Sequence, residues 1–352
     1  MTSSPIRWGV IGTGHIARRF AGDLAHSASG VLAAVGSRDG TRAFGFTADF
    51  GGGIHADETA KILARPDIDA IYVGTVNSAH HDIARAALEA GKPVLVEKPL
   101  APTLSEATAI RDAAERRGLL AMEAMWMVFT PGIVKLKALL AEGAIGAPKS
   151  LSANLSYARA YRPEFELFDA QTGGALLDLG VYPIALALHL FGPAEETGVI
   201  VERNEAGSVR QAALVTRHGR VLTKLSCGFE TEGPNGAMVS GEHGRIALAG
   251  PFFCPPALAL KQHGAGTALD PRGNGASASS DHDLPADERP LNPPLQAGML
   301  PTPIVGTGLQ YQADHFAECL RAGLAQSPVH PLSASLAAID IMDRAGRLAP
   351  SP

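Results

Sequence analysis

Residues 7–17 read RWGVIGTGHIA, an apolar β-like run that meets two glycines and then passes into a helical pattern. Gly12 and Gly14 allow the backbone to turn tightly and approach a pyrophosphate, and Ala17 still allows the helix to pack on the strand. The N-terminus of such a helix favours an anion. We therefore expect a dinucleotide site, although an ordinary tight strand-to-helix turn is the alternative. The residues expected at the pyrophosphate are Gly12, Thr13, Gly14, His15 and Ile16.

The pattern outward from this turn, to residue 126, alternates short strands with helices. Thr103 and Glu106 form a capping box that opens a helix, and Gly118 ends it. Strands separated by helices predict a parallel sheet with helices on both faces, so residues 1–126 are predicted to be a doubly wound α/β domain. Its predicted strands are 7–11, 31–35, 70–73, 93–96 and 119–125.

The pattern changes after residue 126, where strand-like runs follow one another. Gly207, Gly219 and Gly236 separate these runs as hairpin turns would. We predict an α+β domain over 127–352 with a mostly antiparallel open sheet and helices on one face. Residues 264–303, rich in glycine and proline, are expected to be a long loop or insertion. The predicted strands are 199–202, 211–217, 221–229, 238–240 and 245–248, and the predicted helices are 133–140, one after 173–174, 310–322 and 332–348.

Composition excludes several classes of protein. The 352 residues carry a formal net charge of -5 and no basic stripe, which argues against nucleic acid as a partner. The most apolar long segment, 173–191, is interrupted by Asp178, Pro183 and His189, so it is predicted to be a buried helix and not a membrane span. Three scattered cysteines and no secretory signal predict a cytoplasmic protein. His80 and His81 are adjacent and point apart on a helix, and no metal site is predicted.

The end of the second strand bears on the choice of cofactor. A carboxylate at this place holds the ribose of NAD, whereas the chain has Ser37 and Arg38. A hydroxyl and a guanidinium favour a 2′-phosphate and therefore NADP. Asp39 follows at once and weakens that preference, so NAD stays possible. The alternative is that Arg38 is a solvated loop charge.

Glu97-Lys98-Pro99 closes the strand predicted at 93–96. Ligands of open α/β sheets bind beyond the carboxyl ends of the strands, so Lys98 is expected to point into that crevice. A lysine there hydrogen-bonds a substrate oxygen and, if partly desolvated, exchanges a proton near neutral pH. The alternative is a surface lysine paired with Glu97.

Residues 173–183 read GGALLDLGVYP and place two polar groups in an apolar helix. Asp178 and Tyr182 are four residues apart and are expected on one helix face. A cleft-facing acid and phenol would explain them. Alternatively, Asp178 complements the helix dipole and Tyr182 places its ring in the core. His189, further along that face, is expected to be a core histidine.

Together these motifs resemble the family of glucose-fructose oxidoreductase, inositol dehydrogenase and MocA over almost the whole chain. The resemblance rests on the order of Gly12-x-Gly14-x-x-Ala17, Glu97-Lys98-Pro99, residues 123–126 (EAMW) and Gly173-Gly174…Asp178…Tyr182. Because it has Tyr182, with Ala185 three residues later, the chain is most like the branch of dimeric dihydrodiol dehydrogenase and NADP-dependent aldose (xylose or glucose) 1-dehydrogenases. The fold implied is an N-terminal Rossmann domain followed by a substrate and dimerisation domain.

The resemblance also implies roles for individual residues. Tyr182 would donate or accept the proton at the substrate oxygen, and Lys98 would hydrogen-bond that oxygen or the phenol and lower the pKa of the phenol. Asp178 would orient the site, and the Lys98–Pro99 peptide would be cis. His80 is expected to face the cofactor and His81 the solvent. The residues implied at the cofactor, beyond the glycine turn and Ser37-Arg38, are Thr75, Asn77, His80, Glu97, Lys98 and Trp126.

The implied activity is hydride transfer between a nicotinamide and a secondary alcohol or hemiacetal carbon of an aldose, polyol or dihydrodiol. A homodimer or homotetramer is implied as well. Two alternatives come from the same family: a non-catalytic NADP-sensing regulator and an NAD-retaining glycosidase. Relatives often have an arginine two residues after Trp126, where this chain has Val128, so any contact which that arginine makes is expected to be lost.

Overall fold

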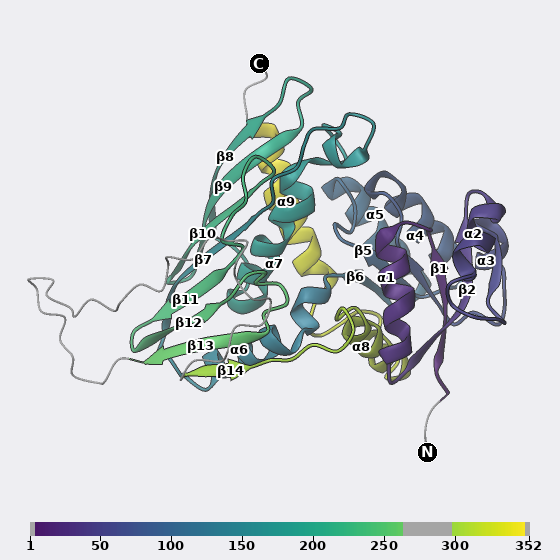
Figure 1. Ribbon diagram of the computed structural model, residues 1–352, viewed down its shortest axis with the longest axis horizontal. Coiled ribbons are helices and arrows are strands. Elements are labelled where there is room, and N and C mark those ends of the chain that lie inside the picture. Colours follow the sequence, from purple (N-terminus) through teal and green to yellow (C-terminus); the bar gives the residue numbers. More distant parts are fainter. Residues whose placement is uncertain (1–3, 263–297, 349–352) are drawn as a thin grey trace, which may run out of the picture.

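A computed structural model describes residues 4–262 and 298–348. Figure 1 shows two sheets side by side, with the first third of the chain forming one and the later strands forming the other. Among the described residues, no helix is both long and apolar enough to cross a bilayer. Only part of the predicted insertion at 264–303 can be judged, because residues 264–297 lie outside the described ranges.

The first sheet has six parallel strands in the order β3-β2-β1-β4-β5-β6. This order reverses direction between β1 and β4, which is where doubly wound sheets bind dinucleotides. All residues of β4, β5 and β6 are buried, as expected for parallel strands covered on both faces. The strands are β1 (Ile6–Ile11), β2 (Gly30–Ser37), β3 (His55–Glu58), β4 (Ala70–Val73), β5 (Val94–Glu97) and β6 (Ala121–Ala124).

The helices of this half follow local sequence signals. Thr103 Oγ1 accepts from the N–H of Glu106, and Gly118 ends the helix with φ 60, as the capping box predicted. The prediction missed β3 and the short helices on either side of it. The helical segments are α1 (His15–Asp23), η1 (Leu24–His26), α2 (Gly40–Thr47), α3 (Thr59–Leu63), η2 (Asn77–Ala79), α4 (His80–Glu89) and α5 (Leu104–Arg117).

The second sheet has eight strands in the order β14-β13-β12-β11-β7-β10-β9-β8. β7 and β10 pair in parallel and the other neighbours pair antiparallel, which confirms a mostly antiparallel sheet. Gly236 was wrongly assigned to a hairpin turn, because β10 and β11 are not neighbours in the sheet. The strands are β7 (Pro148–Ser156), β8 (Glu196–Arg203), β9 (Val209–His218), β10 (Val221–Gly228), β11 (Ala237–Gly241), β12 (Gly244–Leu248), β13 (Ala257–Gln262) and β14 (Met299–Pro301).

Three strands of this sheet were not predicted. Central β7 alternates Leu151, Ala153 and Leu155, which are buried, with small polar residues of low β propensity, so its sequence resembles a loop. β13 was missed altogether. β14 falls inside the stretch expected to be a loop, and it pairs with β13, so that expectation is wrong for residues 299–301.

Helices cover one face of the second sheet and leave the other open. The segment after residue 173 contacts β7, β9 and β10, and α9 contacts β8. Strands β9 and β10 alternate buried and exposed residues, as expected for a sheet with one free face. The remaining helical segments are η3 (Trp126–Phe129), α6 (Pro131–Ala141), η4 (Glu166–Phe168), η5 (Leu176–Gly180), α7 (Val181–Phe191), α8 (Gln310–Arg321) and α9 (Leu332–Leu348).

The end of the chain returns to the first sheet. α8 contacts β2, and α9 contacts α5 and β6 as well as α7 (Figure 1). Buried Asp23, at the end of α1, accepts hydrogen bonds from the backbone N–H of Thr307 at 2.9 Å and of Leu309 at 2.8 Å. The two halves are therefore joined by hydrogen bonds in addition to apolar packing.

Candidate active site

The glycine turn has the backbone geometry that a dinucleotide needs. Gly12 has φ 117, and a Cβ there would lie 2.3 Å from the carbonyl oxygen of Gly74. Only glycine fits at that position. Gly14 is exposed, and a Cβ there would meet no atom within 4 Å. The space in front of the α1 N-terminus is open, so this turn fits a pyrophosphate.

No side chain of the described residues caps α1, and its first turn holds no acidic residue. Its backbone N–H groups therefore stay available to an anion. His15 is exposed and Thr13 and Ile16 are half-buried at this helix start, where the sequence placed them.

At the end of β2, Asp39 has a structural role. Its side chain accepts the N–H of Thr41 at 2.9 Å and caps α2. Ser37 is buried, and Arg38 is exposed beside it. Because the carboxylate is used by its own helix, the groups left at this edge are a hydroxyl and a guanidinium.

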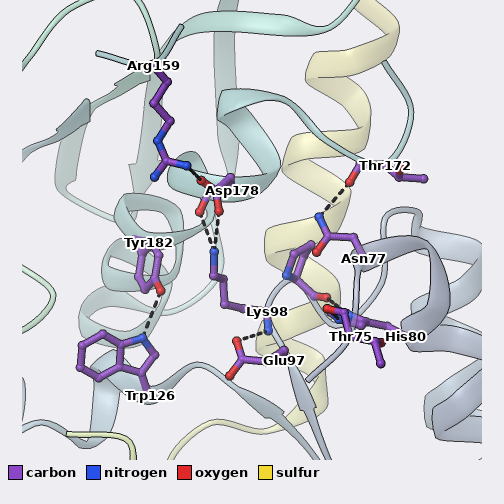
Figure 2. Close-up of polar contacts among 11 residues, drawn as sticks. Thr75, Asn77, His80, Glu97, Lys98, Trp126, Arg159, Thr172, Asp178 and Tyr182 are labelled. Carbon is purple, nitrogen blue, oxygen red and sulfur yellow. Dashed lines mark hydrogen bonds and ion pairs between the residues drawn. The ribbon is translucent and has the colours of Figure 1, made fainter. Parts of the chain in front are cut away.

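The segment after β4 approaches the second half of the molecule. The Asn77 side chain donates to the carbonyl oxygen of Thr172 at 2.8 Å, and Thr75 is half-buried nearby (Figure 2). His80 is fully buried, and its two ring nitrogens lie 2.9 Å and 3.3 Å from the carbonyl oxygens of Pro99 and Thr75. The ring of His80 therefore has no surface for a cofactor, which corrects the expectation that it faces one; it supports the neighbouring backbone.

Lys98 and Asp178 meet across the two halves of the molecule. Lys98 Nζ donates to Asp178 Oδ1 at 3.0 Å and to the Asp178 carbonyl oxygen at 2.8 Å. Figure 2 shows Lys98 pointing from the end of β5 toward Asp178. The Lys98–Pro99 peptide is cis, as the resemblance implied. Lys98 is therefore not a surface lysine paired with Glu97.

Asp178 lies in a π-helical turn, η5, and not in a regular α-helix. Pro183 follows five residues later and has no N–H to donate back to the Asp178 carbonyl in a π turn. That carbonyl accepts Lys98 instead. The expectation of a simple α-helical face shared by Asp178 and Tyr182 is thus wrong in detail, although both residues do reach the same site.

Tyr182 lies beside the lysine, buried at the start of α7. Lys98 Nζ is 5.0 Å from the centre of the Tyr182 ring, and Trp126 Nε1 donates to Tyr182 Oη at 3.0 Å (Figure 2). Phe253 stacks on the phenol ring at 5.0 Å between ring centres. Trp126 is itself buried, so its hydrogen bond fixes the position of the phenol oxygen.

One expectation about protonation is wrong, and the other holds only in part, because Lys98 does lower the pKa of Tyr182 but less than burial raises it. Burial raises the pKa of Tyr182 above its ordinary 10, and the charge of Lys98 only partly offsets that rise. Burial, the largest single effect, lowers the pKa of Lys98, but the charge and hydrogen bond of Asp178, with the charges of Tyr182 and Glu97, together outweigh it and raise that pKa. With its pKa raised, the lysine is a cation at neutral pH, against the expectation that it exchanges a proton there, and the phenol is protonated.

Glu97 lies behind the lysine. Tyr72 Oη donates to Glu97 Oε1 at 2.5 Å, and the N–H of Lys98 donates to Glu97 Oε2 at 3.2 Å. Burial raises the pKa of Glu97 to about 7. With 3% of its surface exposed, Glu97 supports the backbone of Lys98 and cannot touch a cofactor directly.

Two site residues were missed by sequence reasoning. Arg159 Nη1 lies 3.3 Å from Asp178 Oδ2. Glu166 accepts the backbone N–H of Asn77 at 2.7 Å and of Ser78 at 2.9 Å, which joins the two halves of the molecule. Both lie between β7 and η5, in a segment with no periodic pattern, so no sequence signal marked them.

Comparison with known proteins gives the family. The model of the GFO/IDH/MocA oxidoreductase family, described as an NAD-binding Rossmann fold, matches residues 6–125, and the C-terminal domain model of the same family matches residues 133–247. The chain belongs to this family. It is therefore an NAD(P)-dependent oxidoreductase with a two-domain α/β fold.

Relatives match over almost the full length. The trans-1,2-dihydrobenzene-1,2-diol dehydrogenases of Macaca fascicularis and Homo sapiens are both 30% identical, covering 97% and 96% of this chain and 96% and 95% of theirs. A 3-ketoreductase from Actinomadura kijaniata, solved with NADP and TDP-benzene, is 27% identical with a TM-score of 0.75 and covers 98% of both chains. An aldose-aldose oxidoreductase from Caulobacter crescentus, 20% identical, has a TM-score of 0.79, covers 97% of this chain and 98% of its own, and shares the fold.

Proposed function

We propose that this oxidoreductase is an NADP-dependent dehydrogenase or reductase acting on a secondary alcohol or hemiacetal carbon of an aldose, polyol or dihydrodiol. The observation that carries the proposal is the approach of Lys98 Nζ to 5.0 Å from the centre of the Tyr182 ring. The lysine comes from the carboxyl end of a parallel strand and the phenol from the other half of the molecule. This is the edge of the sheet at which such folds bind their ligands.

Each side chain is supported for one task. A bound nicotinamide would supply or accept the hydride. Tyr182 Oη, protonated at neutral pH, donates its proton to a substrate carbonyl oxygen. Lys98 stays charged and stabilises negative charge that develops on that oxygen. Asp178 holds the ammonium in place through two hydrogen bonds.

Names of relatives support the substrate class and the pair of residues. The dihydrodiol dehydrogenases act, by name, on a vicinal diol. Solved structures of the Actinomadura kijaniata ketoreductase include variants of one lysine and one tyrosine, separated by the same number of residues as Lys98 and Tyr182. Those are properties of the relatives, and they support the same roles for Lys98 and Tyr182 here.

NADP is the cofactor we propose. Ser37 and Arg38 lie at the edge where the adenosine ribose would bind, and Asp39 is used as a helix cap. The guanidinium would pair with a 2′-phosphate. Glycine and backbone groups of residues 12–16 would hold the pyrophosphate, with Thr75 and Asn77 toward the nicotinamide.

We also propose that two copies of the chain pair through the open face of the second sheet, giving a homodimer or, by further pairing, a homotetramer. Ile200, Val215 and Leu222 are exposed by 77%, 56% and 59% on the neighbouring strands β8, β9 and β10. Exposed apolar side chains that gather in this way are typical of an interface between proteins. Sedimentation equilibrium tests the assembly, and a monomer at micromolar concentration would contradict it.

The activity is tested by titrating the protein with NADPH and NADH and following fluorescence, then by measuring NADP-linked turnover on aldoses and dihydrodiols. Tyr182→Phe is expected to lower kcat by about 10³-fold, within the range of general acid catalysis. Tyr161→Phe, at an exposed tyrosine, is the matched control and should keep full activity. Tight NADPH binding without turnover would favour the NADP-sensing regulator, and aryl glycoside release without net NADP reduction would favour the glycosidase.

A further inference from the structure

Arg159 lies next to the reacting groups and has no part in the function proposed above. Its Nη1 atom is 3.3 Å from Asp178 Oδ2, on the opposite carboxylate oxygen from Lys98 (Figure 2). Asp178 thus lies between an ammonium and a guanidinium. The two cations therefore flank one carboxylate.

The backbone and the side chain of Arg159 are both held firmly. Its N–H donates to the carbonyl oxygen of Phe229 at 2.9 Å, and its carbonyl oxygen accepts from Arg210 Nη2 at 3.2 Å. The guanidinium lies over the Phe229 ring at 5.1 Å. A cation placed on an aromatic ring in this way is pre-organised, so binding a ligand costs little side-chain entropy.

The guanidinium has donors to spare. Among residues 4–262 and 298–348 its side chain donates no hydrogen bond; its contact with Asp178 is an ion pair alone. The side chain is 36% exposed. Arginine carries five N–H donors in a planar fork that matches a carboxylate. An open edge of that fork therefore faces solvent beside the site.

The charged groups in contact at the site carry a net positive charge, which a bound anion would neutralise. Lys98 and Arg159 are both cations, and Asp178 is the carboxylate in contact with them. Glu97, behind the lysine, is only partly ionised at neutral pH because burial raises its pKa to about 7. The neighbouring Arg210 is already paired with Glu230. The phosphates expected at α1 belong to the other end of the cofactor.

We propose that Arg159 determines the substrate class by binding a carboxylate carried by the substrate, so that the preferred substrate is a polyhydroxy acid such as a sugar acid. The inference rests on the proposed oxidoreductase function and deepens it. Lys98 and Tyr182 act at the reacting oxygen, and Arg159 binds the acid group from the far side of Asp178. A neutral sugar of the same length leaves the fork of Arg159 solvated and gains nothing from it.

Two six-carbon probes that differ in the acid group alone test the proposal. D-gluconate and D-glucitol are titrated calorimetrically into the full-length protein saturated with NADPH, at constant ionic strength. The wild-type protein is expected to bind D-gluconate at least tenfold more tightly than D-glucitol. Arg159→Gln removes that preference, and Arg159→Lys, which keeps charge without the fork, retains part of it. Arg162→Gln, at an exposed arginine of the same segment, is the matched control and keeps it.

Equal binding of the two probes by the wild-type protein, or no binding of either, would overturn the role of Arg159. So would a D-gluconate preference that survives in Arg159→Gln. Circular dichroism and NADPH titration show whether each variant is folded. A wild-type protein that oxidises neutral sugars with NADP but shows no preference for the acid would contradict this inference alone. Failure to bind NADPH would contradict the proposed function.

Discussion

Two carboxylate side chains, each with a nitrogen partner at a similar distance, lie on either side of the loop that follows β5, and the two pairs differ in exposure. At the front, Lys98 and Asp178 are 3.0 Å apart, with 14% and 23% of their side chains exposed. At the back, Glu123 and His330 are 2.9 Å apart, with 1% and 3% exposed. Glu123 also accepts the backbone N–H of Leu100 at 2.9 Å, two residues after Lys98.

The difference in exposure indicates that the front pair serves the reaction and the back pair serves the stability of the fold. The front pair can reach a ligand, and its lysine has a phenol for a neighbour. The back pair is buried and contacts only neighbouring protein groups, among them the N–H of Leu100 and the hydroxyl of Ser335. Removing one partner of a buried pair strongly destabilises the fold, because the other partner is left buried and unpaired. In a partly exposed pair, water solvates the partner that remains. The comparison predicts loss of activity at the front and loss of stability at the back.

The largest effect is expected from Lys98→Met. Removing the ammonium deprives the reacting oxygen of its charged neighbour, and kcat/KM should fall by about 10³-fold. Asp178 keeps Arg159 as a partner, so the melting temperature should change by only a few degrees. Steady-state kinetics and a thermal melt on the same sample check both. A variant that melts much earlier would show that the front pair is architectural too.

Glu123→Gln should have the opposite profile. It breaks a fully buried pair, and the free energy of unfolding should drop by about 3 kcal/mol. Urea unfolding measures the loss, and kcat per folded molecule should stay within a few-fold of the wild type. If kcat fell as far as in Lys98→Met, Glu123 would also be needed for activity, which would contradict a purely structural role for the back pair.

The dependence of stability on pH distinguishes Glu123 from its neighbour on β5, Glu97. Burial raises the pKa of Glu97 from 4.5 to about 7, so between these values the unfolded chain ionises while the folded one stays protonated. Stability therefore falls as pH rises through this window, by about 2 kcal/mol. Burial is also the largest effect on Glu123, but its hydrogen bonds to His330, Ser335 and Leu100 and the charge of His330 together outweigh it. They lower the pKa of Glu123, whose contribution is instead lost as pH falls below about 4.5.

Urea unfolding at pH 5 and pH 8 checks this difference. Glu97→Gln should flatten the fall between the two values, and Glu123→Gln should leave that fall in place. The same fall in wild type and in Glu97→Gln would contradict the assignment.

The smallest effect is expected from Glu166→Gln. Glu166 is half-buried, and it accepts the N–H of Asn77 and Ser78 from across the two halves. Weakening these charge-assisted bonds should raise the KM for the nicotinamide cofactor by about tenfold and leave kcat nearly unchanged. Glu164→Gln, at an exposed glutamate of the same segment, is the control. An equal KM in both variants would contradict the role of Glu166 in positioning the cofactor-binding segment.

Local signals in the sequence predicted most of the first sheet and the front of the site. Gly12, Gly14, Thr103 and Gly118 each impose their conformation on adjacent residues, so one stretch of chain suffices to recognise them. Lys98 and Asp178 are 80 residues apart, and the ordered motifs of the family placed them in one site.

The rest depended on contacts that no local pattern contains. Glu123 and His330 are 207 residues apart, and neither has a motif that points to the other. Protonation was mispredicted because burial of Tyr182 and the charge of Asp178 beside Lys98 are properties of the folded state. β7 was missed because its serines and asparagine do not look like a central strand.

The position of α9 has a consequence for how the protein is made. This helix is the final described element of the chain, yet it packs on α5 and β6, and His330, just before it, pairs with Glu123. During synthesis Glu123 cannot gain its partner until His330 has emerged from the ribosome, and α5 and β6 remain uncovered until α9 follows. Nascent chains stopped short of residue 330 should therefore depend on chaperones more than the released protein does.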